Sequence, residues 1–158
     1  MSQFHSEKVH ILDIEILRFS ISEDDSDAED IHYTLEKCDI GFNLSQKLAK
    51  IIFDIALEGY CSCSFKIEVL FEVDNIEELV EKDKETDKIH PTNKDFYPHL
   101  FAIAYSTIRG IVYTKTLGVR DGGILLPILH PKRFYRKFLK EEKKETDSKT
   151  DPTSKNNS

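Results

Sequence analysis

An alternation of apolar and polar side chains between Ser62 and Asp74, interrupted only at Leu70, constrains the fold more than any other part of the sequence. Successive residues of an extended chain point to opposite faces of a strand, so every second residue lies on the same face. One face is entirely apolar and carries Phe65, Ile67, Val69, Phe71 and Val73. The other face carries Lys66, Glu68 and Glu72. The pattern predicts a strand with one buried and one solvated face, which is typical of antiparallel sheets.

Three further segments have the β-branched content and the period-two apolar spacing of strands. These are Val9–Ile21, Ile31–Leu44 and Lys50–Gly59. In the first, the alternation changes phase between Ile16 and Leu17, which predicts a β-bulge or burial on both faces. Gly59-Tyr60 predicts a hairpin turn. Four strands with short links indicate an antiparallel meander.

The apolar period becomes helical at Phe96, two residues before a proline that suits a first helical turn. Gly118 is a natural C-terminal cap, so we expect a helix of about 20 residues, roughly 30 Å long. One apolar stripe contains Leu100, Ile103, Ala104, Thr107, Ile108 and Ile111. A second stripe contains Phe101, Tyr105, Val112 and Tyr113. One stripe can cover the sheet, and the other must contact something else, such as another subunit.

The remaining segments complete an α+β fold with a four-stranded antiparallel sheet, a long helix and a short C-terminal helix. The charged connection Asp74–Asp95 is expected to cross over the sheet, with one short helical turn near Ile76–Glu81. Pro127 prevents the apolar run Ile124–Leu129 from being regular structure, and Pro131 opens the last helix. We expect a flexible N-terminus over 1–8, a single domain over 9–143 and a disordered polar tail over 144–158.

Charge and composition exclude several classes of function. The formal net charge of −7 over 158 residues argues against nucleic acid as the main partner, because phosphate binding needs a basic face. No apolar run approaches the roughly 20 residues of a membrane span. The first eight residues lack the apolar core of a secretion signal. With only three cysteines, no disulfide framework is implied, and we expect a cytoplasmic protein.

This order of elements resembles the export chaperone SecB and its SecB-like relatives. The strongest part is Leu100–Phe134, where a helix carrying Tyr105 and Arg109 ends at a glycine and is followed by a loop. A Leu-Pro run, here Leu125–Pro127, then precedes the last helix. His130-Pro131 stands where the family often has Asn-Phe. The strand region matches the family in order and length, but hardly in identity.

The resemblance implies an ATP-independent holdase that binds unfolded or partly folded polypeptides, its clients, in an apolar groove. It also implies a homo-oligomer, a dimer of dimers, with no cofactor and no enzymatic activity. The aromatic residues near the two helices exceed what a cover for four strands needs, which favours a groove. The candidate groove residues are Phe101, Tyr105, Tyr113, Ile124, Leu125, Leu126, Ile128 and Phe134.

SecB passes its clients to the SecA motor through an acidic sheet surface and a C-terminal segment. The candidate acidic surface here is Glu23, Asp24, Asp25 and Asp27. The tail Lys144–Ser158 does not look like the SecB end, so the link to export stays open. The alternative is an adaptor for one specific partner, such as an antitoxin-type client. Its recognition surface would be the connection Asn75–Asp95 together with the acidic turn.

Other motifs have ordinary structural interpretations. Cys61 and Cys63 could bind zinc with Cys38, but structural zinc usually needs two such pairs, so we expect small buried side chains. The six histidines form no ligand pair, and no phosphate-binding or nucleophile motif occurs. We therefore assign no catalytic, metal or cofactor residue. The basic helix Lys132–Lys144 also contains acids, which favour a solvated helix end over a membrane or nucleic-acid contact.

Overall fold

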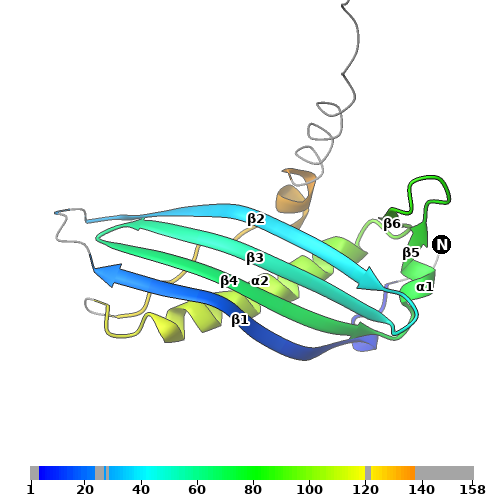
Figure 1. Ribbon diagram of the computed structural model, residues 1–158, viewed down its shortest axis with the longest axis horizontal. Helices are drawn as coiled ribbons and strands as arrows, with labels where there is room; N and C mark the ends of the chain where they lie inside the picture. Colours follow the sequence, from blue (N-terminus) through cyan, green and yellow to red (C-terminus); the bar gives the residue numbers. More distant parts are fainter. Residues whose placement is uncertain (1–3, 24–26, 28, 120–121, 138–158) are drawn as a thin grey trace, which may run out of the picture.

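Four long strands form one antiparallel sheet, and a long helix lies against one of its faces (Figure 1). The computed structural model describes residues 4–23, 27, 29–119 and 122–137. The elements are η1 (Ser6–Lys8), β1 (Val9–Glu23), β2 (Ile31–Asn43), β3 (Leu48–Gly59), β4 (Cys61–Val73), α1 (Ile76–Leu79), β5 (Val80–Lys82), β6 (Ile89–Pro91) and α2 (Phe96–Lys115). Residues 131–137 are also helical. The predicted α+β fold is confirmed.

The strand order is β1-β4-β3-β2, so the predicted meander is correct for β2, β3 and β4 and wrong for β1. β1 pairs with β4 at the opposite edge from β2. Alternation predicts which residues share a face, but it does not encode which strands are neighbours. The link from Glu23 to Ile31 can reach about 26 Å, whereas three strand spacings amount to about 14 Å. The chain can therefore cross the end of the sheet between β1 and β2.

The predicted bulge in β1 is present. The β1–β4 register shifts between Ile16 and Arg18, and a second shift lies between Ile11 and Asp13. The bulges explain why the apolar alternation of β1 changes phase along the sequence. A comparable shift in the β2–β3 pairing lies between Leu35 and Lys37.

The core lies between α2 and the two central strands. The five apolar residues that alternate along β4 are all fully buried, as predicted. Their counterparts on β3 are Ala49, Ile51, Phe53, Ile55 and Leu57. From α2, Phe96, Leu100, Phe101, Ala104, Ile108 and Val112 close the core from the other side. Polar residues of β4 lie on the opposite, partly exposed face.

β1 is exposed along most of its length, because α2 packs mainly on β3 and β4. The apolar residues that β1 exposes are Ile11, Leu12, Ile14, Ile16, Leu17 and Phe19, each between 37% and 51% exposed. Ile11, Ile14, Ile16 and Phe19 pair with buried core residues of β4, so they face the side of the sheet that α2 covers. The fold therefore leaves an apolar strip beside α2 along a free strand edge.

The connection between β4 and α2, and the C-terminal end of α2, differ in detail from what the sequence predicts. The short helical turn is α1, and the β5–β6 hairpin that follows it was not predicted. α2 ends at Lys115, earlier than predicted, and Thr116 rather than Gly118 occupies its C-cap position. Gly118 follows with a φ of 94°, in the left-handed region. No helix in the described ranges is both long and apolar enough to cross a membrane.

Candidate functional site

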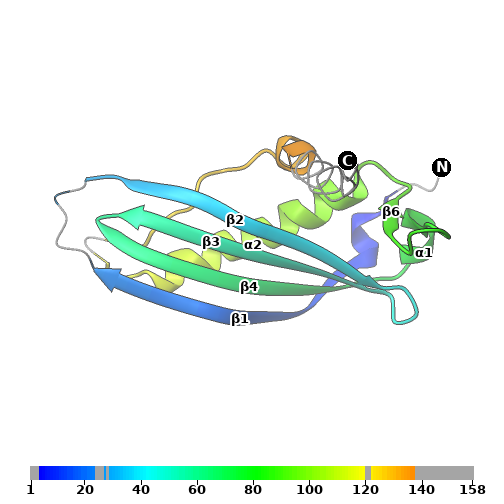
Figure 2. The ribbon, with the colours of Figure 1, turned by 45° about the horizontal axis from the view of Figure 1, so that its top comes forward.

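The segment 122–130, which we call the strap, connects the end of α2 to the final helix at 131–137. Figure 2 shows this final helix next to β2, on the side of the sheet where α2 lies. Burial alternates along the strap. Ile124 and Leu126 are 6% and 1% exposed, whereas Leu125 and Ile128 are 65% and 83% exposed. The strap is thus anchored by two apolar side chains and presents two others outward.

Three hydrogen bonds attach the main chain of the strap to α2. Two come from the side of the helix and one from the residue at its C-cap. The Tyr105 hydroxyl donates to the Pro127 carbonyl at 2.8 Å. The Arg109 Nε donates to the Leu126 carbonyl at 2.9 Å. Tyr105 and Arg109 lie one helical turn apart, so their side chains reach the strap from the same face of α2. At the other end, the Ile124 N–H donates to the buried Thr116 hydroxyl at 2.6 Å.

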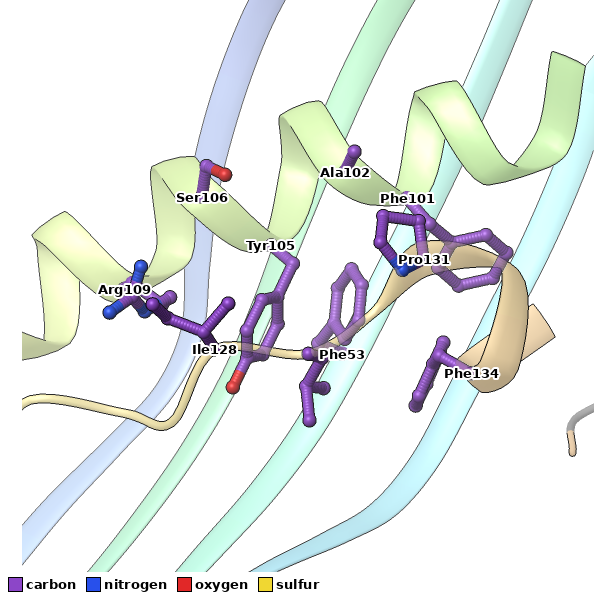
Figure 3. Close-up of a pocket in the computed structure, with 10 residues that line it drawn as sticks. Phe53, Phe101, Ala102, Tyr105, Ser106, Arg109, Ile128, Pro131 and Phe134 are labelled. Carbon is purple, nitrogen blue, oxygen red and sulfur yellow. The ribbon is translucent and has the colours of Figure 1, made fainter. Parts of the chain in front are cut away.

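An apolar cavity of about 70 Å³ opens between α2, β3, the strap and the final helix. Figure 3 shows side chains from all four segments around it. Its lining includes Phe53, Phe101, Tyr105, Arg109, Ile128 and Phe134. The lining is mostly apolar, which suits an apolar side chain better than a charged one.

Three phenylalanine rings from different segments form the wall of the cavity. The Phe53 and Phe101 ring centroids are 5.9 Å apart, in an edge-to-face arrangement. Phe134 lies 5.3 Å from Phe101 and 6.4 Å from Phe53. Each distance falls within the range of favourable aromatic pairs, about 4.5–7 Å. The three rings pack against one another, which holds the final helix to the core.

A larger cleft of about 580 Å³ adjoins the cavity and lies between β2 and the final helix. Ile128, Leu129 and Phe134 line both spaces, so the two lie side by side, and together we call them the groove. The cleft is more polar than the cavity. Its other lining residues are Tyr33, Thr34, Leu35, Glu36, Lys37, Cys38, His130, Arg133 and Lys137. β2 is an edge strand, so one side of its main chain faces away from β3 without a neighbouring described strand.

Two groups at the base of the cleft are held in their neutral forms. Burial, with a smaller effect of Tyr105, raises the pKa of Tyr33 far above its ordinary value. Burial also raises the pKa of the Cys38 thiol, with a smaller effect of Asp39. The buried Tyr33 hydroxyl has no hydrogen-bond partner among the described residues. Neither group offers a nucleophile near neutral pH, because a reactive cysteine needs a lowered pKa.

The predicted groove residues fall into three sets. Phe101, Tyr105, Ile128 and Phe134 meet around the cavity. Ile124 and Leu126 belong to the strap and have buried side chains. Leu125 and Tyr113 are exposed and line neither the cavity nor the cleft. Sequence reasoning missed Phe53 and Tyr33, because the alternation around each of them predicted only a strand face.

The other sequence candidates lie away from the groove. Glu23 ends β1, and Asp27 is exposed in the following link, whereas Asp24 and Asp25 lie outside the described residues. Cys61 and Cys63 are buried, as predicted, with their sulfur atoms 3.6 Å apart. Burial, together with Cys61, raises the pKa of Cys63 to about 12. Within the described ranges, no three side chains of the metal-binding types cluster.

Comparison with known proteins yields similarity in structure only. No protein-family model and no curated protein matches the sequence. The structure is similar to the SecB-like chaperone Rv1957 of Mycobacterium tuberculosis, solved with a ChAD peptide from the HigA1 antitoxin. The TM-score is 0.53 at 18% identity, over 78% of this chain and 91% of that chain. This similarity confirms the predicted SecB-like fold.

A second match is a Streptococcus agalactiae protein of unknown function, with a TM-score of 0.43 and 11% identity. It covers 76% of this chain and 97% of that chain. Because its score is low, we base no argument on it.

Proposed function

We propose that this chain is an ATP-independent holdase that binds non-native polypeptide in the groove formed by the cavity and the cleft. The single observation that carries the proposal is that the two spaces share lining residues and lie beside the edge of β2 that has no described neighbouring strand. An extended segment can pair with an edge strand while alternate side chains enter pockets. The SecB-like fold, and the peptide bound to the M. tuberculosis chaperone, support this function.

The chemistry of the groove favours broad rather than narrow selectivity. Burial of apolar surface contributes about 25 cal/mol per Å², so about 100 Å² of client side chain contributes roughly 2.5 kcal/mol. Apolar contacts are not directional, and many sequences satisfy them. Binding by several weak sites on one client then adds through avidity. The proposed function is binding without enzymatic activity, as the similarity to a SecB-like chaperone supports.

We further propose that the chain is a homo-oligomer in which a second copy covers β1. An exposed, apolar edge strand is a liability unless another chain or element covers it. The strip that β1 exposes lies on the helix side of the sheet, and its edge is free. A second copy offers the same strip, which makes a two-fold contact self-complementary. The dimer of dimers that the SecB resemblance implies would require a second interface.

The alternative is an adaptor that binds one specific partner, such as an antitoxin-type client. The antitoxin peptide on the M. tuberculosis chaperone supports this alternative as well. Cytoplasmic location, client hand-over to SecA and the acidic surface of Glu23, Asp24, Asp25 and Asp27 are further proposals. The domain limits at 9–143, with an N-terminal segment 1–8 and a tail 144–158, also stay predictions.

The test of the holdase proposal is suppression of aggregation without ATP. An unfolded client is diluted from denaturant with and without the chain, and light scattering is followed at several molar ratios. We expect suppression near stoichiometric ratios with several unrelated clients. A folded sample that suppresses none of them would refute the holdase. Suppression confined to one client would favour the adaptor.

A further inference from the structure

Positive charge gathers among the exposed residues that line the cleft, which we call its rim, although the whole chain has a net charge of −7. The lining includes Lys37, Arg133 and Lys137, with His130 beside them and Glu36 as the only described carboxylate. Lys37 pairs with Asp39 at 3.2 Å. No ion pair joins Arg133 or Lys137 to another described residue, and both are exposed. The groove thus combines an apolar floor with two cations that lack a described partner.

The two cations have a spacing that an extended peptide can match. Arg133 and Lys137 are four residues apart in a helical segment, so they are neighbours on one face, about 5–6 Å apart at Cβ. Residues i and i+2 of a strand are about 6.7 Å apart and point the same way. Arg133 also directly precedes Phe134, which lines both the cavity and the cleft. Successive strand residues point to opposite faces, so an apolar residue on the same side as the two carboxylates must lie a further two positions along the peptide.

We propose that the groove selects client segments in which two acidic residues two positions apart are followed, two positions further on, by an aromatic or branched apolar residue. This inference rests on the proposed function and adds a preference to it. The net negative charge of the chain does not oppose the preference at physiological salt, because the Debye length is then about 8 Å. The charges nearest to the peptide decide whether acidic or basic peptides bind more tightly, and at this rim those charges are mostly positive.

The expected ratio of the affinities for acidic and neutral peptides follows from the exposure of Arg133 and Lys137. An exposed ion pair changes an equilibrium constant by about two- to fivefold. Two such pairs predict about four- to 25-fold tighter binding of an acidic segment than of its neutral counterpart. Salt should reduce this ratio, because exposed charges are screened. The apolar contribution should be retained at high salt, so all peptides should still bind there.

The test compares three labelled peptides of equal length that contain the same phenylalanine. They carry Asp-x-Asp-x-Phe, Asn-x-Asn-x-Phe or Lys-x-Lys-x-Phe, and Kd is measured by fluorescence anisotropy at about 50 mM and about 500 mM salt. We expect the order acidic, neutral, basic at low salt and a smaller spread at high salt. Equal affinities at low salt would overturn the inference and leave the holdase standing. Binding of none of the three would overturn the inference and the client groove alike.

Charge-reversal variants identify the residues responsible. Arg133→Glu combined with Lys137→Glu should reverse the order of the peptides, while Arg133→Lys should preserve it. The matched control is Lys84→Glu combined with Lys88→Glu, which makes the same charge change at exposed positions of the β5–β6 hairpin. The control variant should keep the acidic preference. A control that reverses the order as well would show that net charge, not the rim, sets the preference, and would refute the inference.

Discussion

Replacing Ile128 by alanine separates a role in client binding from a role in stability. Ile128 is 83% exposed, although it lines both the cavity and the cleft. Exposed substitutions usually change the free energy of unfolding by less than about 0.5 kcal/mol. A bound client, in contrast, would cover this side chain. We therefore expect Ile128→Ala to weaken peptide binding while the chain remains as stable as before.

The size of the effect follows from the atoms removed. The change from isoleucine to alanine deletes three carbon atoms, and each buried methylene contributes about 0.8 kcal/mol. Full coverage by the client would give about 2.4 kcal/mol, which is roughly a 60-fold increase in Kd. Half coverage would give about 1.2 kcal/mol, or roughly eightfold. We expect a measured value between these limits.

Leu125 supplies the matched control. It lies on the same strap, is 65% exposed and lines neither space, and its change to alanine removes the same three carbon atoms. Peptide Kd is measured by fluorescence anisotropy, and stability by urea denaturation, for both variants. We expect Leu125→Ala to change Kd less than twofold. Equal weakening by both variants, or no weakening by Ile128→Ala, would refute the assignment of the groove.

Three further predictions concern other parts of the structure. Tyr33→Phe should leave the free energy of unfolding unchanged or slightly higher, because it removes an unpaired buried hydroxyl, whereas Tyr105→Phe should cost about 1 kcal/mol by removing a strap hydrogen bond. Urea denaturation compares the two, and a larger loss for Tyr33→Phe would contradict this account. Ile16→Lys should lower the oligomer mass measured by light scattering, while Glu15→Lys, on the other face of the same strand, should not; an unchanged mass in both argues against β1 as the interface. Gly59→Ala should destabilise the chain by about 1–3 kcal/mol, because a Cβ there would lie 2.1 Å from a main-chain oxygen; an unchanged melting temperature would contradict this.

Local periodicity was sufficient to predict most of the elements. The shift from period two to a helical period at Phe96 marks the first residue of α2, and the phase change near Leu17 marks a real bulge. Both features depend on residues close together in the chain. The pairing of β1 with β4 depends on contacts far apart in the sequence, and apolar alternation does not specify which edge a strand occupies.

For the candidate groove too, the sequence predicted local features but not those that depend on contacts between distant residues. Sequence identified an apolar, proline-broken run, but it could not determine which of its side chains are anchors and which are outward. Leu126 and Tyr105 are two of the predicted groove residues, but a charged residue there would be placed at positions that are 1% and 6% exposed. Such a variant would fail to fold before client binding could be measured. The exposed Ile128 gives a test that avoids this difficulty.

The way the strap is attached has a consequence for protein engineering. Tyr105 and Arg109 bind main-chain oxygens, which every amino acid supplies, so these two attachments do not depend on the side chains of the residues they hold. Outward positions such as Leu125 and Ile128 can then be randomised in a library without removing either attachment. The strap is in this respect comparable to a recognition loop displayed on a rigid scaffold. New binding preferences could evolve there while the sheet and the helix stay the same.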